Sequence, residues 1–318
     1  MEELEPIVDV RASSIDASRL VEAYSRIYGF MAGHLAQAVD TLVEGLGSSR
    51  LRILTFTGNL VSTGLRGVLA ELVGSGLFNV VITTTGALDH DIARANGGTY
   101  YRGAFEYDDE ELLDKGFHRL GNILIPVDSY GPRVEEFTRR LLQSIGDGSR
   151  IGVSDLLWRA GELIDDENSI LKAARESRAR VFVPGWPDGA FGTSLFMEAQ
   201  RLGKDIVIDY FRDMKLLADI FFPSEGKATA LIIGGGISKH HAIWWSQFRG
   251  GLDYTVYLTT AVEYDGSLSG AHPREAVSWG KVKPGSRRVV VYGDATITLP
   301  IIAGELLRRA QTPGRSLI

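Results

Sequence analysis

Short apolar runs recur along the chain, and several of them end in glycine or in small hydroxyl residues. These runs are nearly continuous and do not alternate with polar residues, which is typical of strands buried on both faces of a parallel sheet. We expect strands at 53–56, 80–82, 123–127, 181–183, 206–208, 231–233, 255–258 and 289–292.

Between these runs, apolar residues recur with the spacing of amphipathic helices. The spacing predicts helices at 65–73, 88–95, 133–145, 169–177, 193–201 and 300–309, the last with Pro300 at its start. A long stretch at 21–46 shows the same spacing before the first strand. The alternation predicts a doubly wound α/β fold with a mostly parallel, Rossmann-like sheet and an N-terminal helical segment (1–50) packed on it. Without a linker or repeat, we expect one domain over 1–318.

Composition narrows the class of protein. The 318 residues are 44% hydrophobic and 23% charged, with a net charge of −6, so the chain lacks the excess of cations that nucleic acid requires. Cysteine is absent, which excludes disulfides, thiolate metal sites and a cysteine nucleophile and suits a reducing compartment. Residues 1–10 lack the hydrophobic core of a secretory signal, and no run reaches the roughly 20 apolar residues of a membrane span. We expect a cytoplasmic protein that binds neither nucleic acid nor membrane.

Polar turns follow two of the predicted strands, where open α/β sheets bind their ligands. The residues of these turns are Gly58, Asn59, Leu60, Val61 and Ser62 after one strand, and Thr84, Thr85 and Gly86 after the next. Small hydroxyl, amide and glycine residues before a helix suit contact with phosphate or ribose. Each turn alone is more simply explained as a helix N-cap, and neither is a GxGxxG fingerprint. Two such turns in one sheet nevertheless favour a nucleotide site.

A third turn, at 234–241, contains three glycines followed by Ile237, Ser238, Lys239, His240 and His241. Adjacent histidines on a helix diverge by about 100° and chelate one metal poorly. Because the chain also lacks cysteine and an HExxH motif, we expect no metal. A single histidine near a reacting amine, acting as donor or proton shuttle, is the functional interpretation. The simpler interpretation is a pair of histidines exposed to water at the start of a helix.

The segment 259–281 concentrates three carboxylates, Glu263, Asp265 and Glu275, together with Trp279 and Lys281. A lysine beside a tryptophan is partly desolvated, which disfavours its ammonium form and makes a nucleophilic amine available. Carboxylates and aromatic faces also suit a polycationic ligand. The alternative is a surface lysine next to a core tryptophan. The residues alone therefore predict a nucleotide-binding α/β protein with a candidate amine nucleophile.

The motifs GGGISKHH, EYDGSLSGA and EAVSWGK resemble those of the deoxyhypusine synthase family. FTGNLVSTG, TTTGALDHD, DGAFGT and GDAT extend the resemblance over nearly the whole chain. The resemblance implies an enzyme that uses NAD to oxidise spermidine and carries the aminobutyl group as an imine on a lysine. It then transfers this group to a lysine of translation initiation factor five-A. The family resemblance also implies a homotetramer.

By position, the resemblance makes Lys281 the nucleophile and His240 a catalytic residue that touches the polyamine and relays protons. The residues that it implies for NAD binding are Gly58, Asn59, Leu60, Val61, Ser62, Thr84, Thr85, Gly86, His90, Asp188, Thr260, Ala261, Asp294 and Ala295. Those that it implies for substrate binding are Asp89, His90, Thr193, Gly235, His240, Gly266, Ser267, Leu268, Glu275, Trp279 and Lys281.

Three positions depart from the family pattern. Thr193 and Leu268 stand where the family has acidic residues, and Trp244 replaces an asparagine. One explanation is an archaeal-type branch that grips spermidine through the side chains of Asp89, Asp265, Glu275, Trp244, Trp245 and Trp279. The other is a changed amine donor. We favour the first because the motif around the nucleophile is intact. Two further hypotheses are a homospermidine synthase-like transferase acting on a free amine, and a catalytically silent sensor of NAD or polyamine.

Overall fold

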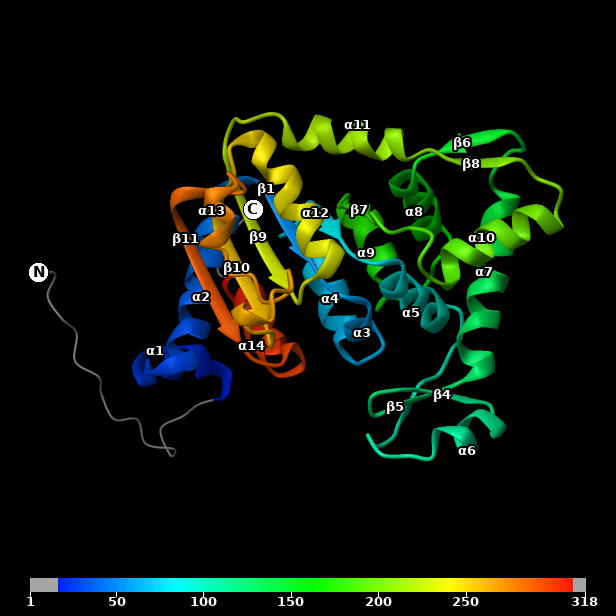
Figure 1. Ribbon diagram of the computed structural model, residues 1–318, viewed down its shortest axis with the longest axis horizontal. Coiled ribbons are helices and arrows are strands. Elements are labelled where there is room, and N and C mark those ends of the chain that lie inside the picture. Colours follow the sequence, from blue (N-terminus) through cyan, green and yellow to red (C-terminus); the bar gives the residue numbers. More distant parts are fainter. Residues whose placement is uncertain (1–16, 311–318) are drawn as a thin grey trace, which may run out of the picture. The chain divides into compact units, whose positions relative to one another are not determined.

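The computed structural model describes residues 17–310 (Figure 1). The prediction for residues 1–10 and the start of the predicted 1–50 segment lie outside the described residues. The chain divides into two compact units, the first holding the residues up to Leu54 and from Phe221 onward, the second running from Thr55 to Ile220. The single domain over 1–318 stays a prediction.

The central sheet confirms the predicted fold class. Its six strands follow the order β11 (Val282–Tyr292), β10 (Leu252–Thr259), β9 (Lys227–Ile233), β1 (Ser49–Thr55), β2 (Val80–Ile82) and β7 (Arg180–Phe182). β10 pairs in parallel with both β9 and β11, and β2 pairs in parallel with β7. β2, β9 and β10 are buried along most of their length, as continuous apolar runs predict. β11 is buried mainly in its second half, at 289–291.

The helices of the first unit are α1 (Leu20–Ile27), α2 (Phe30–Ser48), α12 (Gly236–Ser246), α13 (Glu275–Ser278) and α14 (Ala295–Ala310). α13 packs on β11 and α14 on β10, while α1 packs on α2 and α14. α2 covers β9, β10 and β11 and also contacts α14. This packing confirms the predicted N-terminal helical segment over its described part. The segment is not one helix, because the left-handed φ angles of Tyr28 (58°) and Phe30 (52°) break it between α1 and α2.

Pro300 lies inside α14, so the predicted start of this helix at Pro300 is wrong. The helix begins earlier because Asp294 caps it: the Thr296 amide donates to Asp294 Oδ1 over 2.9 Å. A carboxylate in this place satisfies an amide that the first turn leaves unpaired.

The second unit holds most of the remaining helices. They are α3 (Gly58–Val61), α4 (Leu65–Gly74), α5 (Thr85–Ala95), α6 (Asp109–Asp114), α7 (Gly131–Gln143), α8 (Val153–Glu162), α9 (Ile170–Ser177), α10 (Ala190–Arg201) and α11 (Tyr210–Phe221). α4 packs on α9, α10 packs on α7, and α3 packs on α5. No helix in the described residues is both long enough and apolar enough to cross a membrane.

Two predicted strands form outside the central sheet. β5 (Ile123–Pro126) lies antiparallel between β3 (Tyr101–Arg102) and β4 (Phe117–Leu120), and β8 (Ile206–Ile208) pairs only with β6 (Ser149–Ile151). Their assignment as strands buried on both faces is therefore wrong. The side chains differ accordingly, because Ile125 alone is buried in β5 and no residue of β8 is fully buried.

Candidate functional site

Lys281 stands at the entrance to β11, with its backbone held on both sides. Its amide donates to the carbonyl of Ala276 over 3.0 Å, and its carbonyl accepts from the Leu252 amide over 3.1 Å. Its side chain is only 9% exposed. Its Nζ lies 5.1 Å from the centre of the Trp279 ring and 5.7 Å from that of Trp244. The expectation of a partly desolvated lysine beside Trp279 is confirmed.

His240 lies on α12, which starts directly after β9. Its ring stacks on Trp244 one helical turn later, with ring centres 5.8 Å apart and planes inclined by 24°. Burial, and then the positive charge of Lys281, hold the pKa of His240 below its usual 6.5. The imidazole is therefore mainly neutral at pH 7 and can accept a proton. The structure places this acceptor in the electrostatic field of the candidate nucleophile.

The neighbouring His241 and Trp245 face different surroundings. His241 contacts Trp245, with ring centres 6.2 Å apart, and burial lowers its pKa to about 4. Trp245 is 6% exposed and packs against the rings of Phe221, Phe222 and Phe248. Trp245 therefore belongs to an aromatic cluster and is not accessible to a ligand. Trp244 remains a candidate ligand contact. In residues 17–310, no cluster of histidine, aspartate and glutamate is arranged to hold a metal ion.

Lys239 is a residue that sequence reasoning passed over. It is 1% exposed, and its Nζ donates to the carbonyl of Ala271 over 2.8 Å and lies 4.2 Å from the centre of the Tyr257 ring. Burial lowers its pKa to about 8, while the charge of Glu275 acts in the opposite direction. In the sequence, the only sign of a role for Lys239 is its position between the glycine turn and the histidine pair. Lys239 ties the predicted substrate segment to α12.

The predicted substrate segment 266–268 is held at its base. The Thr259 hydroxyl and, more weakly, Lys239 donate to the carbonyl of Ser269, at 3.2 and 3.5 Å. Gly235 packs so closely on this point that a Cβ there would lie 2.4 Å from the α-carbon of Ser269. A glycine is therefore required sterically at 235.

Other predicted residues of the first unit lie near the surface. Gly266 and Ser267 are exposed beside Asp265, whose Oδ1 accepts from the Ser267 amide over 2.6 Å. Leu268 is half-buried, and Glu275 is exposed at the first position of α13. The remaining predicted cofactor residues are the exposed Thr260 and Asp294 and the half-buried Ala261 and Ala295.

In the second unit, the segment 58–62 forms the short helix α3 instead of a loop. The side chains of Leu60, Val61 and Ser62 are buried, and the Ser62 hydroxyl donates to the carbonyl of Asn59 over 2.7 Å. Asn59 is exposed. A cofactor would therefore meet the backbone and Asn59 here, while Leu60 and Val61 serve the core.

The start of α5 also combines a buried side chain with a more accessible position. Thr85 is buried, and its hydroxyl donates to the carbonyl of Trp186 over 2.9 Å. Thr84 is half-buried before it, and Gly86 has no atom within 4 Å of the place that a Cβ would occupy. The first turn is therefore open on the Cβ side of Gly86, while Gly58 packs closely on the carbonyl carbon of Gly86.

Asp89 is buried at 1% exposure and caps α10. Its carboxylate accepts from the amides of Ala190 (2.8 Å) and Phe191 (2.7 Å) and from the Tyr130 hydroxyl (3.1 Å). Burial raises its pKa to about 6, although these hydrogen bonds favour the charged form. The negative charge of Asp188 contributes to the same rise. Asp188 itself is exposed, as is Thr193 in the first turns of α10.

His90 lines a cavity of about 250 Å³ together with His118, Leu120, Ile125 and Tyr130. Its Nδ1 is hydrogen-bonded to the hydroxyl of Tyr100 at 2.8 Å. Burial, and then the charge of Arg94, lower the pKa of His90 to about 4. His90 is thus neutral at physiological pH and can contact a ligand by hydrogen bonding but not by charge.

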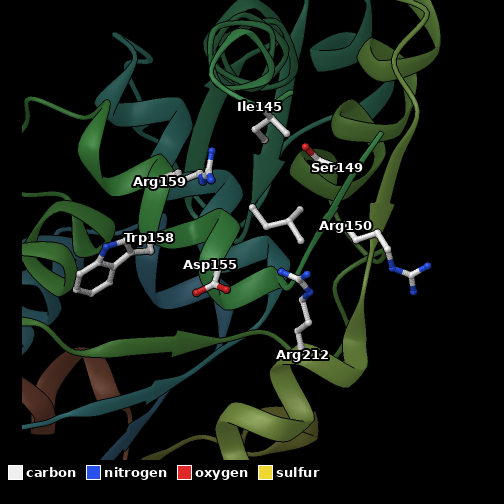
Figure 2. Close-up of a pocket in the computed structure, with 8 residues that line it drawn as sticks. Ile145, Ser149, Arg150, Asp155, Trp158, Arg159 and Arg212 are labelled. Atoms are coloured by element: carbon white, nitrogen blue, oxygen red, sulfur yellow. The ribbon is translucent and has the colours of Figure 1, made fainter. Parts of the chain in front are cut away.

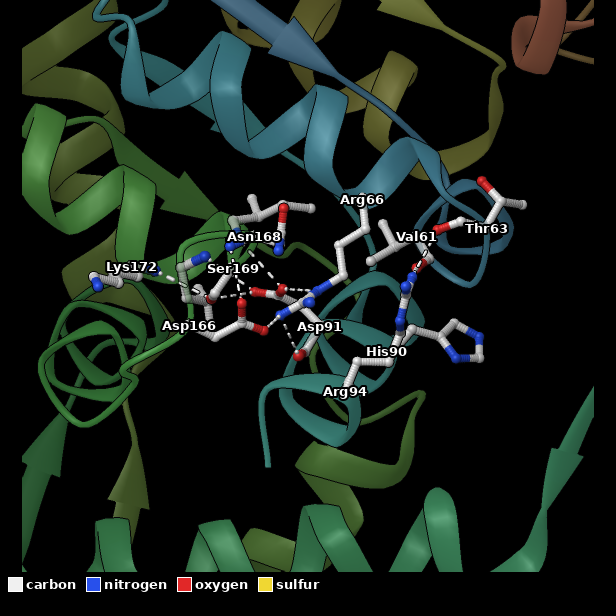
Figure 3. A network of polar contacts seen from close by, with 12 residues as sticks. Val61, Thr63, Arg66, His90, Asp91, Arg94, Asp166, Asn168, Ser169 and Lys172 are labelled. Atoms are coloured by element: carbon white, nitrogen blue, oxygen red, sulfur yellow. Dashed lines mark hydrogen bonds and ion pairs between the residues drawn. The ribbon is translucent and has the colours of Figure 1, made fainter. Parts of the chain in front are cut away.

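A buried ionic network holds α5 in place (Figure 3). Arg66 donates to Asp91 and to Asp166, both over 2.7 Å, and Asp91 also accepts from the Ser169 hydroxyl over 2.9 Å. The amides of Ile170 and Leu171 complete the set by donating to Asp91. Because α5 also carries Asp89 and His90, this network fixes the helix that presents them.

A second cavity, of about 300 Å³, lies between the end of α7, α8 and the start of α11 (Figure 2). Its lining includes Arg150, Arg159, Arg212, Asp155 and Trp158. None of the predicted site residues lines this cavity, and we assign it no part in the chemistry.

The structure therefore brings together two groups of predicted residues, one in each unit. In the first unit, Lys281 lies with Trp279 and the His240–Trp244 pair. In the second unit, Asp89 and His90 lie on α5, with Asp188 close enough to perturb Asp89.

Comparison with known proteins identifies relatives over almost the whole length. The family model described as deoxyhypusine synthase matches residues 19–306. A "probable deoxyhypusine synthase" of Aeropyrum pernix is 68% identical over 96% of this chain and 99% of its own. Another from Ignicoccus hospitalis is 53% identical, over 96% of this chain and 97% of its own. The crystal structure of a proposed deoxyhypusine synthase from Entamoeba histolytica has the same fold, with a TM-score of 0.64, 21% identity and coverage of 93% and 94% of the two chains.

Proposed function

We propose, on the premise that the chain belongs to the deoxyhypusine synthase family, that it transfers the aminobutyl group of spermidine to a lysine of translation initiation factor five-A. The observation that carries the proposal is the position of Lys281, which is buried with its Nζ close to two indole rings and with the neutral His240 nearby. The motif that surrounds it is intact. We propose that the enzyme is a cytoplasmic homotetramer that uses NAD.

The residues present fit a dinucleotide. The open space beside Gly86, in the first turn of α5, suits a phosphate. The exposed carboxylates of Asp188 and Asp294 can accept hydrogen bonds from ribose hydroxyls. A bound NAD would supply the redox chemistry: a hydride acceptor for the carbon next to the secondary amine of spermidine, and a hydride source for the final imine. The other proposed NAD contacts are Gly58–Ser62, Thr84, Thr85, His90, Thr260, Ala261 and Ala295.

The part of Lys281 in the reaction follows from amine chemistry. Its neutral nitrogen attacks the carbon of the oxidised donor and forms a new C–N bond. The bond to 1,3-diaminopropane then breaks, and this amine leaves with a proton. The four-carbon fragment stays on Lys281 as an imine, which a lysine of the factor attacks in the same way. His240 can take the proton that Lys281 loses and deliver it to the leaving amine.

Residues proposed to contact the substrate occur in each unit. In the first, Glu275, Trp279 and the backbone at Gly235 and 266–268 are proposed to contact the amine. In the second, Asp89, His90 and Thr193 are proposed to do so. The capping bonds of Asp89 to α10 mean that this carboxylate attracts a cation mainly through its charge.

The test uses purified protein, NAD, spermidine labelled in its aminobutyl group, and the factor. We expect label on one lysine of the factor, and no transfer by Lys281→Arg, because a guanidinium keeps the charge but does not become a neutral nucleophile. Covalent label on the Lys281→Arg protein would contradict the assignment of Lys281. Label on added putrescine and never on the factor would select the homospermidine synthase-like activity, which the neutral Thr193, Leu268 and Trp244 keep as a second candidate.

A further inference from the structure

Lys281 is a buried lysine whose surroundings are aromatic. In residues 17–310, no carboxylate lies within ion-pair distance of its ammonium group, and its close partners are the rings of Trp244 and Trp279, at 5.7 and 5.1 Å. The faces of indole rings attract cations at these distances. A positive charge that forms on this nitrogen is therefore stabilised by the ring quadrupoles.

The two rings come from different elements. Trp244 lies on α12, and Trp279 directly follows α13. Two neighbouring rings contact Trp244. His240 stacks on it, and Phe248 meets it edge-on with ring centres 6.3 Å apart. Both indoles remain partly exposed, at 43% for Trp244 and 64% for Trp279. The pair can therefore take up a ligand while it covers the lysine.

We propose that Trp244 is a specificity-determining residue which, with Trp279, forms an aromatic clamp around the nitrogen of Lys281. The clamp holds the alkylammonium group of the amine donor and then the protonated imine. This inference rests on the proposed function. The protonated imine carries its positive charge on Nζ of Lys281, which lies 5.7 and 5.1 Å from the two ring centres, so the same rings can stabilise it. Trp245, buried in the aromatic core, has no part in the clamp.

The first experiment traps the imine. Protein, NAD and labelled spermidine are mixed without the factor, and borohydride reduces the C=N bond to a stable secondary amine on Lys281. We expect Trp244→Leu to lower the trapped label by about 5- to 30-fold, since a desolvated cation–π contact has about this strength. Trp244→Phe keeps an aromatic face and should stay within about 3-fold of wild type.

Trp158→Leu is the matched control. It removes another indole that faces cations, here Arg175 and Arg180 at 4.3 and 4.8 Å, and should leave trapping unchanged. Trapping by Trp244→Leu at the wild-type level would overturn the clamp. An equal loss in Trp244→Phe and Trp244→Leu would also overturn it, because the aromatic face would then be irrelevant.

A second measurement separates the clamp from the proposed function. If wild type traps no NAD-dependent imine, the proposed function fails, and calorimetric titration of spermidine in the absence of NAD then decides on the clamp. We expect binding to weaken about 5- to 30-fold in Trp244→Leu and not in Trp158→Leu. Equal affinity in all three proteins, or no binding to wild type, would overturn the clamp.

Discussion

The ammonium group of Lys239 lies 4.2 Å from the centre of the Tyr257 ring, and both side chains are almost completely buried. Burial lowers the pKa of this lysine to about 8 and raises that of the Tyr257 phenol. The amine also holds the carbonyl of Ala271. One cation thus joins α12, β10 and the segment that leads to Glu275.

We expect Lys239 to make stability depend on pH. Its pKa in the folded protein, about 8, is lower than the 10.5 of an unfolded lysine. The folded state therefore releases this proton first, and stability rises as pH increases between these values, by roughly 3 kcal/mol. Guanidinium unfolding at pH 7.5 and 10.5 should show this rise in wild type and not in Lys239→Met. An identical pH dependence in both proteins would contradict the lowered pKa.

Asp89 should give the opposite slope at acid pH. Its pKa is raised from 3.8 to about 6 in the folded state, so its contribution is full below pH 3.8 and is lost as pH rises through 6. The loss amounts to roughly 3 kcal/mol. His90 and His241 act in the opposite direction over the same range, because their pKa values are lowered to about 4. The test is therefore a difference: from pH 4 to 7, the unfolding free energy of wild type minus that of Asp89→Asn should fall by this amount. Asp109→Asn, at an exposed position, is the control and should retain the wild-type slope.

Asp91 should be essential for stability. It accepts from Arg66, Ser169 and the first amides of α9, and it is fully buried. Asp91→Asn leaves the Arg66 guanidinium without one of its two carboxylates, which we expect to cost about 3–5 kcal/mol in unfolding free energy. Glu162→Gln breaks the exposed pair with Arg175 and should change it by less than about 0.5 kcal/mol. Equal effects of the two substitutions would show that burial of the network adds nothing.

Gly235→Ala should disturb the substrate segment, because the added Cβ would overlap Ser269. We expect a fall in transfer activity of at least about 10-fold together with a lower melting temperature. Gly64→Ala is the control: no atom lies within 4 Å of the added methyl, and φ is −66°, so stability should stay equal or rise slightly. Full activity in Gly235→Ala would mean that the segment can shift without harm.

The strands of the central sheet were predictable because they are short, continuous apolar runs, and Val80–Ile82 matches its prediction at both ends. The runs at 123–127 and 206–208 have the same composition but pair elsewhere, and composition does not encode which partner a strand meets. The break between α1 and α2 was missed for a related reason, since apolar spacing continues through Tyr28 without any sign of its left-handed backbone.

For the candidate site, the sequence indicated Lys281 and its neighbour Trp279 because they adjoin in the chain. The contact of Lys281 with Trp244 joins positions 37 residues apart, on different elements, and only the fold reveals it. Likewise Asp89 is a carboxylate in the sequence, whereas the structure commits its oxygens to the start of α10. Local motifs thus identify the chemical groups, and tertiary packing decides how free each one is to act.

The main-chain bonds on both sides of Lys281 have a kinetic consequence. With its backbone tied to Ala276 and Leu252, the lysine can move only its flexible four-carbon arm. Donor and acceptor amines must then visit the same small volume one after the other. Departure of the first amine product should precede entry of the second lysine, and initial-rate plots at varied donor concentration should give parallel lines for different amounts of acceptor.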